Sequence, residues 1–99
     1  MTRPALVETE KEWSAVVADY ARLRGWERFH PFLSIHSPSG WPDETLCRPP
    51  RLVVAELKSE KGKVTGAQRR WLDLLEGCPP LEVFVWRPSD WPTVQKVLW

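Results

Sequence analysis

The feature that most constrains this chain is the segment LVVAELK at residues 52–58, which is apolar on both faces of a strand until Glu56. Such a run is typical of a strand buried within a sheet. A turn with two prolines, residues 48–51, precedes it, and a strand pattern over residues 42–47 precedes the turn. Two strands joined by so short a connection are expected to pair antiparallel. The sequence therefore predicts a hairpin whose second strand is buried.

Apolar residues at helical spacing predict two longer helices, and each begins with a capping box. Thr9 and Glu12 frame the first box, at the start of a helix expected over residues 9–24. Thr65 and Gln68 frame the second box. In each pair the third helical residue is expected to return a hydrogen bond to the capping residue, which fixes where the helix begins.

Two short strands and a last helix complete the chain. The strands are expected over residues 26–30 and 81–86, and Ser89 or Asp90 is expected to cap a short C-terminal helix. The predicted order along the chain is αβββαβα. Because 99 residues leave no room for two cores, we expect one domain over residues 1–99.

Composition excludes several classes of protein. Hydrophobic residues make up 42% and charged residues 27% of the chain, which is typical of a globular domain. Cys47 and Cys78 have neither metal-binding nor disulfide-framework spacing, which excludes zinc ribbons, zinc fingers and secreted cystine scaffolds. No apolar run reaches the roughly 18 residues of a membrane span, and residues 1–4 lack the apolar stretch of a signal peptide. We therefore expect no membrane association and a cytoplasmic location.

A pair of carboxylates is the candidate chemical site. A turn centred between the two prolines pairs residues whose numbers sum to 99, which places Cys47 opposite Leu52. The same register places Asp43 opposite Glu56, with Cβ atoms about 5 Å apart on one face. Two carboxylates that close need a shared proton, a cation or a metal, and Lys58 lies on the same face as Glu56. Two acids and a lysine at the end of a buried sheet suit a Mg²⁺ site.

The chemistry expected of such a site is phosphodiester hydrolysis. A metal held by Asp43 and Glu56 would bind a scissile phosphate and lower the pKa of a coordinated water. Lys58 would position that water or stabilise the charge that develops on the phosphorane. Its alternative role is that of a counter-charge to Glu56, and the two roles are compatible.

These residues resemble a known family. The segments GWPD at 40–43 and AELK at 55–58 look like the PD-(D/E)xK nuclease signature. Further segments resemble the VRR-NUC branch, in particular small stand-alone phage or prophage proteins of the Holliday-junction-resolvase-like type, and the resemblance covers nearly the whole chain. These segments are Trp13, Gly25-Trp26, Phe29-His30, the run ELKSEKGK at 56–63, the pattern T-x-x-Q-x-x-W-L from Thr65, and WRPSD at 86–90.

The resemblance implies a restriction-endonuclease-like α/β fold, an αβββαβ core with a central mixed four-stranded sheet and a short C-terminal helix. It implies Mg²⁺ or Mn²⁺ as cofactor, held by Asp43, Glu56 and the backbone carbonyl of Leu57. In the family a glutamate of the first helix and a glutamine after the sheet lysine join the site, which indicates Glu12 and Gln68 here. Both residues are also capping-box members, and Glu8 and Glu10 compete with Glu12 for the role.

Basic residues indicate where a nucleic acid would bind. The net charge is only +1, but half of the 14 Lys and Arg residues lie within residues 48–70. Lys61 and Lys63 follow the candidate site, where they would hold phosphates; the alternative is a solvated loop. The remaining candidate contacts are Arg69, His30 and His36, and His36 stands in a loop where relatives often carry arginine. His30 is alternatively a surface residue or a contact to the site residues.

Two features fall outside the motifs. Glu44 follows the motif aspartate where the family usually has an aliphatic residue, so we expect it either at a strand edge or with a displaced strand register. Among the tryptophans, Trp71 is expected in the core, whereas Trp86, Trp91 and Trp99 belong either to the core or to a partner surface.

Three functions are compatible with the sequence. The first is a metal-dependent endonuclease that hydrolyses DNA, with branched or Holliday-junction DNA as candidate substrate and a homodimer as the expected assembly. The second is a catalytically silent DNA- or protein-binding module that keeps the nuclease fold. The third is a metal-dependent phosphodiesterase on RNA or on mismatched flaps. If the gene is carried by a phage, the protein acts in the cytoplasm of the bacterial host.

Overall fold

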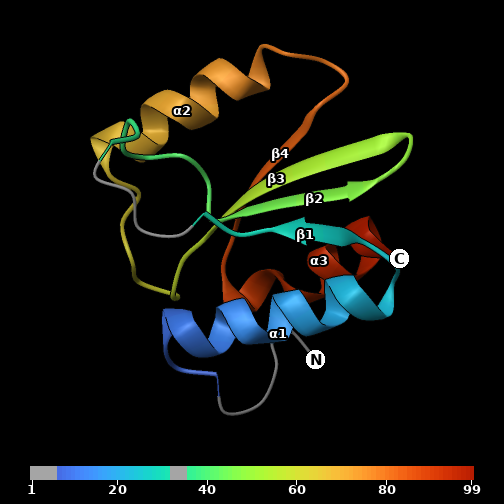
Figure 1. Cartoon of the computed structure of the whole chain (residues 1–99). Coiled ribbons are helices and arrows are strands. Elements are labelled where there is room, and N and C mark those ends of the chain that lie inside the picture. Colours follow the sequence, from blue (N-terminus) through green and yellow to red (C-terminus); the bar gives the residue numbers. More distant parts are fainter. Residues whose placement is uncertain (1–6, 32–35) are drawn as a thin grey trace.

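A mixed four-stranded sheet organises the molecule, and the computed structural model describes residues 7–31 and 36–99 of the chain. The strands lie in the order β1-β2-β3-β4 (Figure 1). The first three are antiparallel neighbours, and β4 runs parallel to β3. The predicted mixed sheet is therefore confirmed. The strands are β1 (Glu27–Phe29), β2 (Glu44–Arg48), β3 (Arg51–Leu57) and β4 (Glu82–Trp86).

Helices cover both faces of the sheet, as the two apolar faces of β3 require. Helices α1 (Glu10–Leu23) and α3 (Trp91–Leu98) lie on one face, and α2 (Gly66–Glu76) lies on the other (Figure 1). A 3₁₀ turn, η1 (Pro88–Asp90), leads into α3. The element order is the predicted αβββαβα, with this turn added.

Both capping boxes are present. Glu12 N donates to Thr9 Oγ1 at 3.1 Å, and Thr9 N donates to Glu12 Oε1 at 2.9 Å. The box at the start of α2 has the same two bonds between Thr65 and Gln68. At α3 the prediction was only half right, because Asp90 occupies the N-cap position without a side-chain bond to that helix.

The register of the β2–β3 hairpin is the predicted one, with Cys47 opposite Leu52. Glu44 lies opposite Ala55 in β2, which is an inner strand between β1 and β3. The expectation of a displaced register was therefore wrong, and Glu44 is the first residue of a strand that does not lie at the edge of the sheet. Its buried carboxylate is stabilised by hydrogen bonds to Arg28 and His30.

The core lies between the sheet and the helices α1 and α3. Trp13 and Trp86 are fully buried, and Trp13 Nε1 donates to the carbonyl oxygen of Trp86 at 2.9 Å. Trp91 packs against this core, whereas Trp99 is exposed. The prediction for Trp71 was wrong: its ring is half-buried and packs edge-on against a neighbouring aromatic ring on the other face of the sheet.

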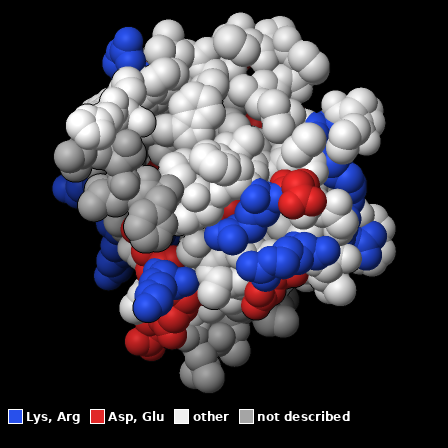
Figure 2. Space-filling model, viewed as in Figure 1, with Lys and Arg blue, Asp and Glu red and all other residues white. Residues whose placement is uncertain are grey.

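Charged side chains are unevenly distributed on the face seen in Figure 2. Lys, Arg, Asp and Glu gather over its lower half, whereas few lie over the upper half, on the α2 side. Within the described part of the chain, no helix is both long and apolar enough to cross a bilayer. Residues 1–6 and 32–35 lie outside the described residues.

Candidate functional site

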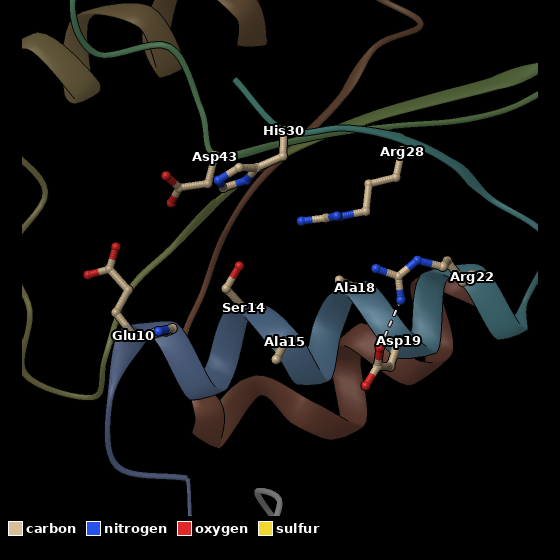
Figure 3. A pocket seen from close by; sticks show the side chains of 10 residues that line it. Glu10, Ser14, Ala15, Ala18, Asp19, Arg22, Arg28, His30 and Asp43 are labelled. Carbon is tan, nitrogen blue, oxygen red and sulfur yellow. Dashed lines mark hydrogen bonds and ion pairs between the residues drawn. The ribbon is translucent and has the colours of Figure 1, made fainter. Parts of the chain in front are cut away.

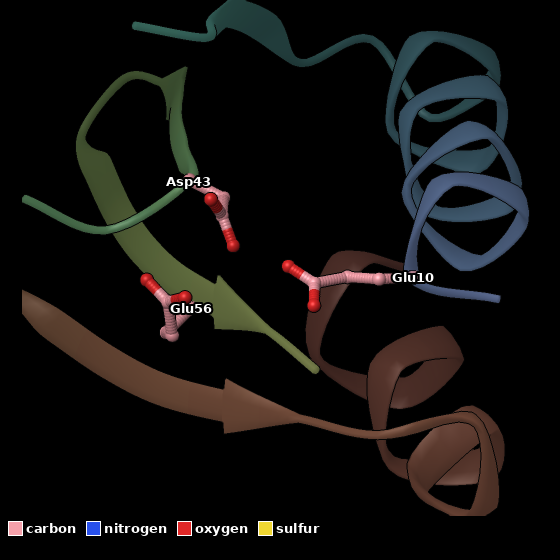
Figure 4. A group of neighbouring side chains, drawn as sticks. All are labelled: Glu10, Asp43 and Glu56. Atoms are coloured by element: carbon pink, nitrogen blue, oxygen red, sulfur yellow. The ribbon is translucent and has the colours of Figure 1, made fainter. Parts of the chain in front are cut away.

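Three carboxylates from separate elements meet at the end of the sheet. Glu10 comes from the first turn of α1, Asp43 immediately precedes β2, and Glu56 lies near the end of β3. One carboxylate oxygen of each lies within 4.8 Å of the other two, and the three side chains point toward one another (Figure 4). The structure thus brings Asp43 and Glu56 together, as the hairpin register predicted.

Asp43 is fixed from two sides. Its Oδ2 accepts a hydrogen bond from Leu57 N at 2.9 Å, which ties the entry of β2 to the end of β3. Upstream, Gly40 has φ +99°, and a Cβ there would collide with the backbone of Ala67 and Gln68. Only glycine permits this approach, so the segment before Asp43 lies directly on the first turn of α2. The Leu57 carbonyl stays a predicted metal ligand.

Glu56 is the one fully buried carboxyl group of the three that form the cluster. Its side chain is 1% exposed, and neither carboxylate oxygen has a hydrogen-bond partner within the described residues. Burial, together with the nearby negative charge of Asp43, raises the pKa of Glu56 to about 8. A buried carboxylate without partners is costly, and a ligand that supplies positive charge would remove this cost.

Lys58 lies beside Glu56, as the two-residue strand period predicted. Its side chain is buried, and Nζ lies 3.5 Å from Glu56 Oε2. This distance makes an ion pair but exceeds ordinary hydrogen-bond lengths. The backbone nitrogen of Lys58 donates to the carbonyl of Trp86 at 3.0 Å, which extends the β3–β4 pairing by one residue. The ammonium therefore offsets only part of the negative charge.

The acid of α1 that lies in the cluster is Glu10, one of the three candidates, whereas Glu12 is engaged in the capping box. Which of them acts in the site stays a prediction. Glu12 Oε1 accepts from the backbone nitrogens of Glu8 and Thr9, at 3.1 and 2.9 Å. These backbone hydrogen bonds lower the pKa of Glu12. A side chain fixed on its own helix terminus does not reach the sheet, whereas Glu10 points to the cluster (Figure 4). The sequence already disfavoured Glu12, because the glutamate of a capping box is hydrogen-bonded to the backbone at the start of its own helix.

Gln68 stands at the start of α2, where its Oε1 accepts from Thr65 N. The three-carboxylate group does not include it. Its backbone nitrogen lies against Gly40, so it contacts the segment that carries Asp43. The structure places Gln68 beside that segment, and its role in the site stays a prediction.

Lys61 and Lys63 are exposed on the loop that follows β3. This loop is held by Arg87, a residue to which no role had been assigned. Arg87 Nη1 donates to the carbonyl oxygens of Ser59 and Gly62, both at 2.7 Å. Because β4 runs parallel to β3, a residue directly after β4 reaches the loop directly after β3, and this adjacency depends on the strand order.

The other predicted nucleic-acid contacts occupy different environments. Arg69 is exposed on α2 and pairs with Asp73 and Glu76 of the same helix, at 3.0 and 3.3 Å. His36 is exposed and lies on the loop before Gly40. His30 follows β1 and contacts Glu44, which the sequence had left without a partner.

The composition of the carboxylate cluster fits a divalent cation. Glu10, Asp43 and Glu56 offer hard oxygen ligands, which Mg²⁺ and Mn²⁺ prefer over nitrogen or sulfur. The two partnerless oxygens of Glu56 are acceptors already removed from water. A cation bound there would satisfy them and would relieve the repulsion between the acids.

Comparison with known proteins supports the fold. No protein-family description and no curated protein matches the chain. A solved structure named "VRR_NUC domain protein" superposes with a TM-score of 0.69, over 91% of this chain and 84% of that one, at 19% sequence identity. At this identity the likeness concerns the backbone alone. The chain therefore has the α/β fold of a VRR-NUC domain, with its mixed four-stranded sheet and C-terminal helix.

Proposed function

We propose that this chain is a metal-dependent nuclease that hydrolyses phosphodiester bonds of DNA. The observation that carries the proposal is the buried Glu56 carboxylate, which lacks hydrogen-bond partners and faces Asp43 and Glu10. The fold shared with a VRR_NUC domain protein supports the same function, because the name of that protein refers to a nuclease domain and the carboxylate cluster suits metal-dependent hydrolysis.

Each residue of the site has a distinct task in this proposal. Glu10, Asp43 and Glu56 would hold Mg²⁺ or Mn²⁺, which when bound supplies a Lewis acid and lowers the pKa of a water ligand. Lys58 is buried and carries its charge 3.5 Å from Glu56. Its ammonium would donate to the attacking water or to the phosphoryl oxygens, where negative charge increases in the transition state.

The substrate form and the assembly are parts of the same proposal. A domain of 99 residues covers a short stretch of duplex, so symmetric cleavage of two strands needs two copies related by a two-fold axis. A homodimer acting on branched DNA satisfies this requirement. Sedimentation equilibrium alone and with four-way-junction DNA tests it, and a species that stays monomeric in both would favour a nicking enzyme.

The experiment that tests the activity is a cleavage panel. Labelled duplex, single strand, flap and four-way junction, each as DNA and as RNA, are incubated with Mg²⁺, Mn²⁺ or EDTA. We expect metal-dependent cleavage of at least one DNA form, and none by Asp43→Asn or Glu56→Gln. Cleavage confined to RNA would move the substrate to RNA. DNA binding without cleavage under every metal would support the silent binding module instead.

A further inference from the structure

A groove with a volume of about 550 Å³ extends from the carboxylate cluster along α1. Glu10 and Asp43 line it at one end, and Arg28 and His30 line it from β1 and the residue that follows (Figure 3). Arg28 points into the space above α1, and His30 lies between Arg28 and Asp43. The groove therefore joins the candidate metal site to a guanidinium and an imidazole.

Both side chains are hydrogen-bonded to the carboxylate of Glu44. Arg28 donates from Nε to Glu44 Oε1 at 2.7 Å and from Nη2 to Oε2 at 2.8 Å. His30 Nδ1 lies 3.0 Å from Oε2. Because a carboxylate only accepts, Nδ1 carries the proton in this contact and Nε2 is the nitrogen directed away from Glu44. Glu44 is 0% exposed, so its position fixes both side chains.

The exposed part of Arg28 suits a phosphate group, and His30 donates to such a group from Nε2 when its ring is protonated on both nitrogens. Glu44 uses two of the five N–H groups of the guanidinium, which leaves three for another acceptor. The Arg28 side chain is 24% exposed and that of His30 is 43% exposed. A planar guanidinium held in one orientation matches the paired oxygens of a phosphate. Asp19, an acid that also lines the groove, is paired with Arg22 at 2.8 Å.

We propose that Arg28 and His30, positioned by the buried carboxylate of Glu44, form a phosphate-binding subsite next to the carboxylate cluster. It would hold a backbone phosphate of the nucleic-acid strand, adjacent to the phosphate that is cut. The proposal rests on the proposed function and adds to it the direction in which the strand leaves the site, along α1 and β1. In this arrangement Glu44 is a positioning residue.

A second ion pair of the same form provides the matched control. Arg51 donates from Nε and Nη2 to Glu82, at 2.8 and 2.7 Å, in the same two-bond geometry. Arg51 begins β3, whereas Glu56 lies near its end, so the control pair sits at the opposite end of the sheet. Neither Arg51 nor Glu82 lines the groove.

The test compares the charge-neutral double variants Arg28→Met/Glu44→Leu and Arg51→Met/Glu82→Leu. Each removes one cation and one anion, so net charge is unchanged. Apolar replacement of a buried pair such as Arg28–Glu44 usually preserves the fold, and the partly exposed Arg51–Glu82 pair contributes less to stability. Binding of labelled single-stranded and duplex DNA is measured by fluorescence anisotropy in EDTA over a range of salt concentrations. Thermal unfolding checks both proteins, and Arg28→Gln/Glu44→Gln replaces the first variant if it does not fold.

We expect the Arg28/Glu44 variant to lose about tenfold in affinity and to reduce the slope of log K against log salt by about one, the change expected for one lost phosphate contact. The Arg51/Glu82 variant should keep the wild-type slope. Equal slopes in all three proteins, or equal losses in both variants, would overturn the subsite. Because binding is measured without metal, this outcome is independent of whether the protein cleaves DNA.

Discussion

Glu44 and Glu56 lie on neighbouring strands, and both side chains are fully buried, yet their surroundings are opposite. Glu44 is hydrogen-bonded to Arg28 and His30 through both of its oxygens. Glu56 has no hydrogen-bond partner among the described residues, and its nearest cation is Lys58 at 3.5 Å. The charge of Glu44 is compensated by side chains of the protein itself. The carboxyl oxygens of Glu56 remain available to a bound ligand.

This difference shows that burial of an acid does not by itself indicate a reactive site. A buried carboxylate costs several kcal/mol of folding free energy unless paired, and Glu44 is paired. Burial of Glu56 lowers the stability of the metal-free chain at neutral pH, because folding holds its carboxyl in the protonated form; such a perturbed group is typical of a site built for a ligand. The contrast also predicts that removing the partner of Glu44 lowers the free energy of unfolding, whereas neutralising Glu56 raises it.

The largest effect is expected from Lys58, the partner that Glu56 does have. Lys58→Ala should lower kcat by on the order of 10³-fold while metal and DNA affinity change little, because its charge acts mainly on the transition state. Single-turnover cleavage at saturating enzyme measures this directly. Normal turnover at saturation with weaker DNA binding would make Lys58 an electrostatic contact.

The next effect tests the compensated acid. Arg28→Ala leaves Glu44 buried with His30 alone, and should lower the free energy of unfolding by about 3 kcal/mol. Urea denaturation monitored by tryptophan fluorescence gives this value. The matched variant Arg51→Ala, whose partner Glu82 is partly exposed, should cost about 1 kcal/mol or less. Equal losses would mean that Glu44 is no better compensated than a surface acid.

Glu56 should make the stability of the metal-free protein depend on pH. The pKa of Glu56 is raised to about 8 in the folded chain, so folding favours the protonated form. The metal-free protein should therefore be most stable below pH ~4.5 with respect to this group, and should lose that stability as pH rises toward 8. Glu56→Gln should remove this loss and be the more stable protein at pH 8. A wild-type-minus-variant difference that stays constant from pH 4.5 to 8 would contradict it.

The smallest effect separates the two glutamates of α1. Glu12→Gln should cost about 0.5 kcal/mol, because it weakens a capping box, and should leave cation affinity unchanged. Glu10→Gln should hardly change stability but should weaken cation binding about tenfold. Thermal unfolding with and without Mg²⁺ measures both properties. A larger loss of Mg²⁺ stabilisation in Glu12→Gln would return the role to Glu12.

The hairpin half of the site was predictable from sequence, whereas the remainder was not. A two-proline turn and a period of two fix which residues of β2 and β3 face each other, so Asp43 and Glu56 followed from counting. Which side of α1 faces the sheet depends on tertiary packing and not on the spacing of nearby residues. The sequence therefore left Glu8, Glu10 and Glu12 as three candidates. The environment of Glu44 was not predicted, because its partners Arg28 and His30 lie in β1 or directly after it. A long connection separates β1 from β2, so the spacing of residues does not show that the two strands pair.

Isothermal titration of the metal-free protein with Mn²⁺ tests the central claim most directly. If Glu10, Asp43 and Glu56 form a cation site, the wild type should bind with saturable heat and release protons, since ligand carboxylates must be ionised. Glu56→Gln should abolish this binding, whereas Glu12→Gln should retain it. Binding of equal affinity in wild type and Glu56→Gln, or none in a folded wild type, would contradict the assignment of the site.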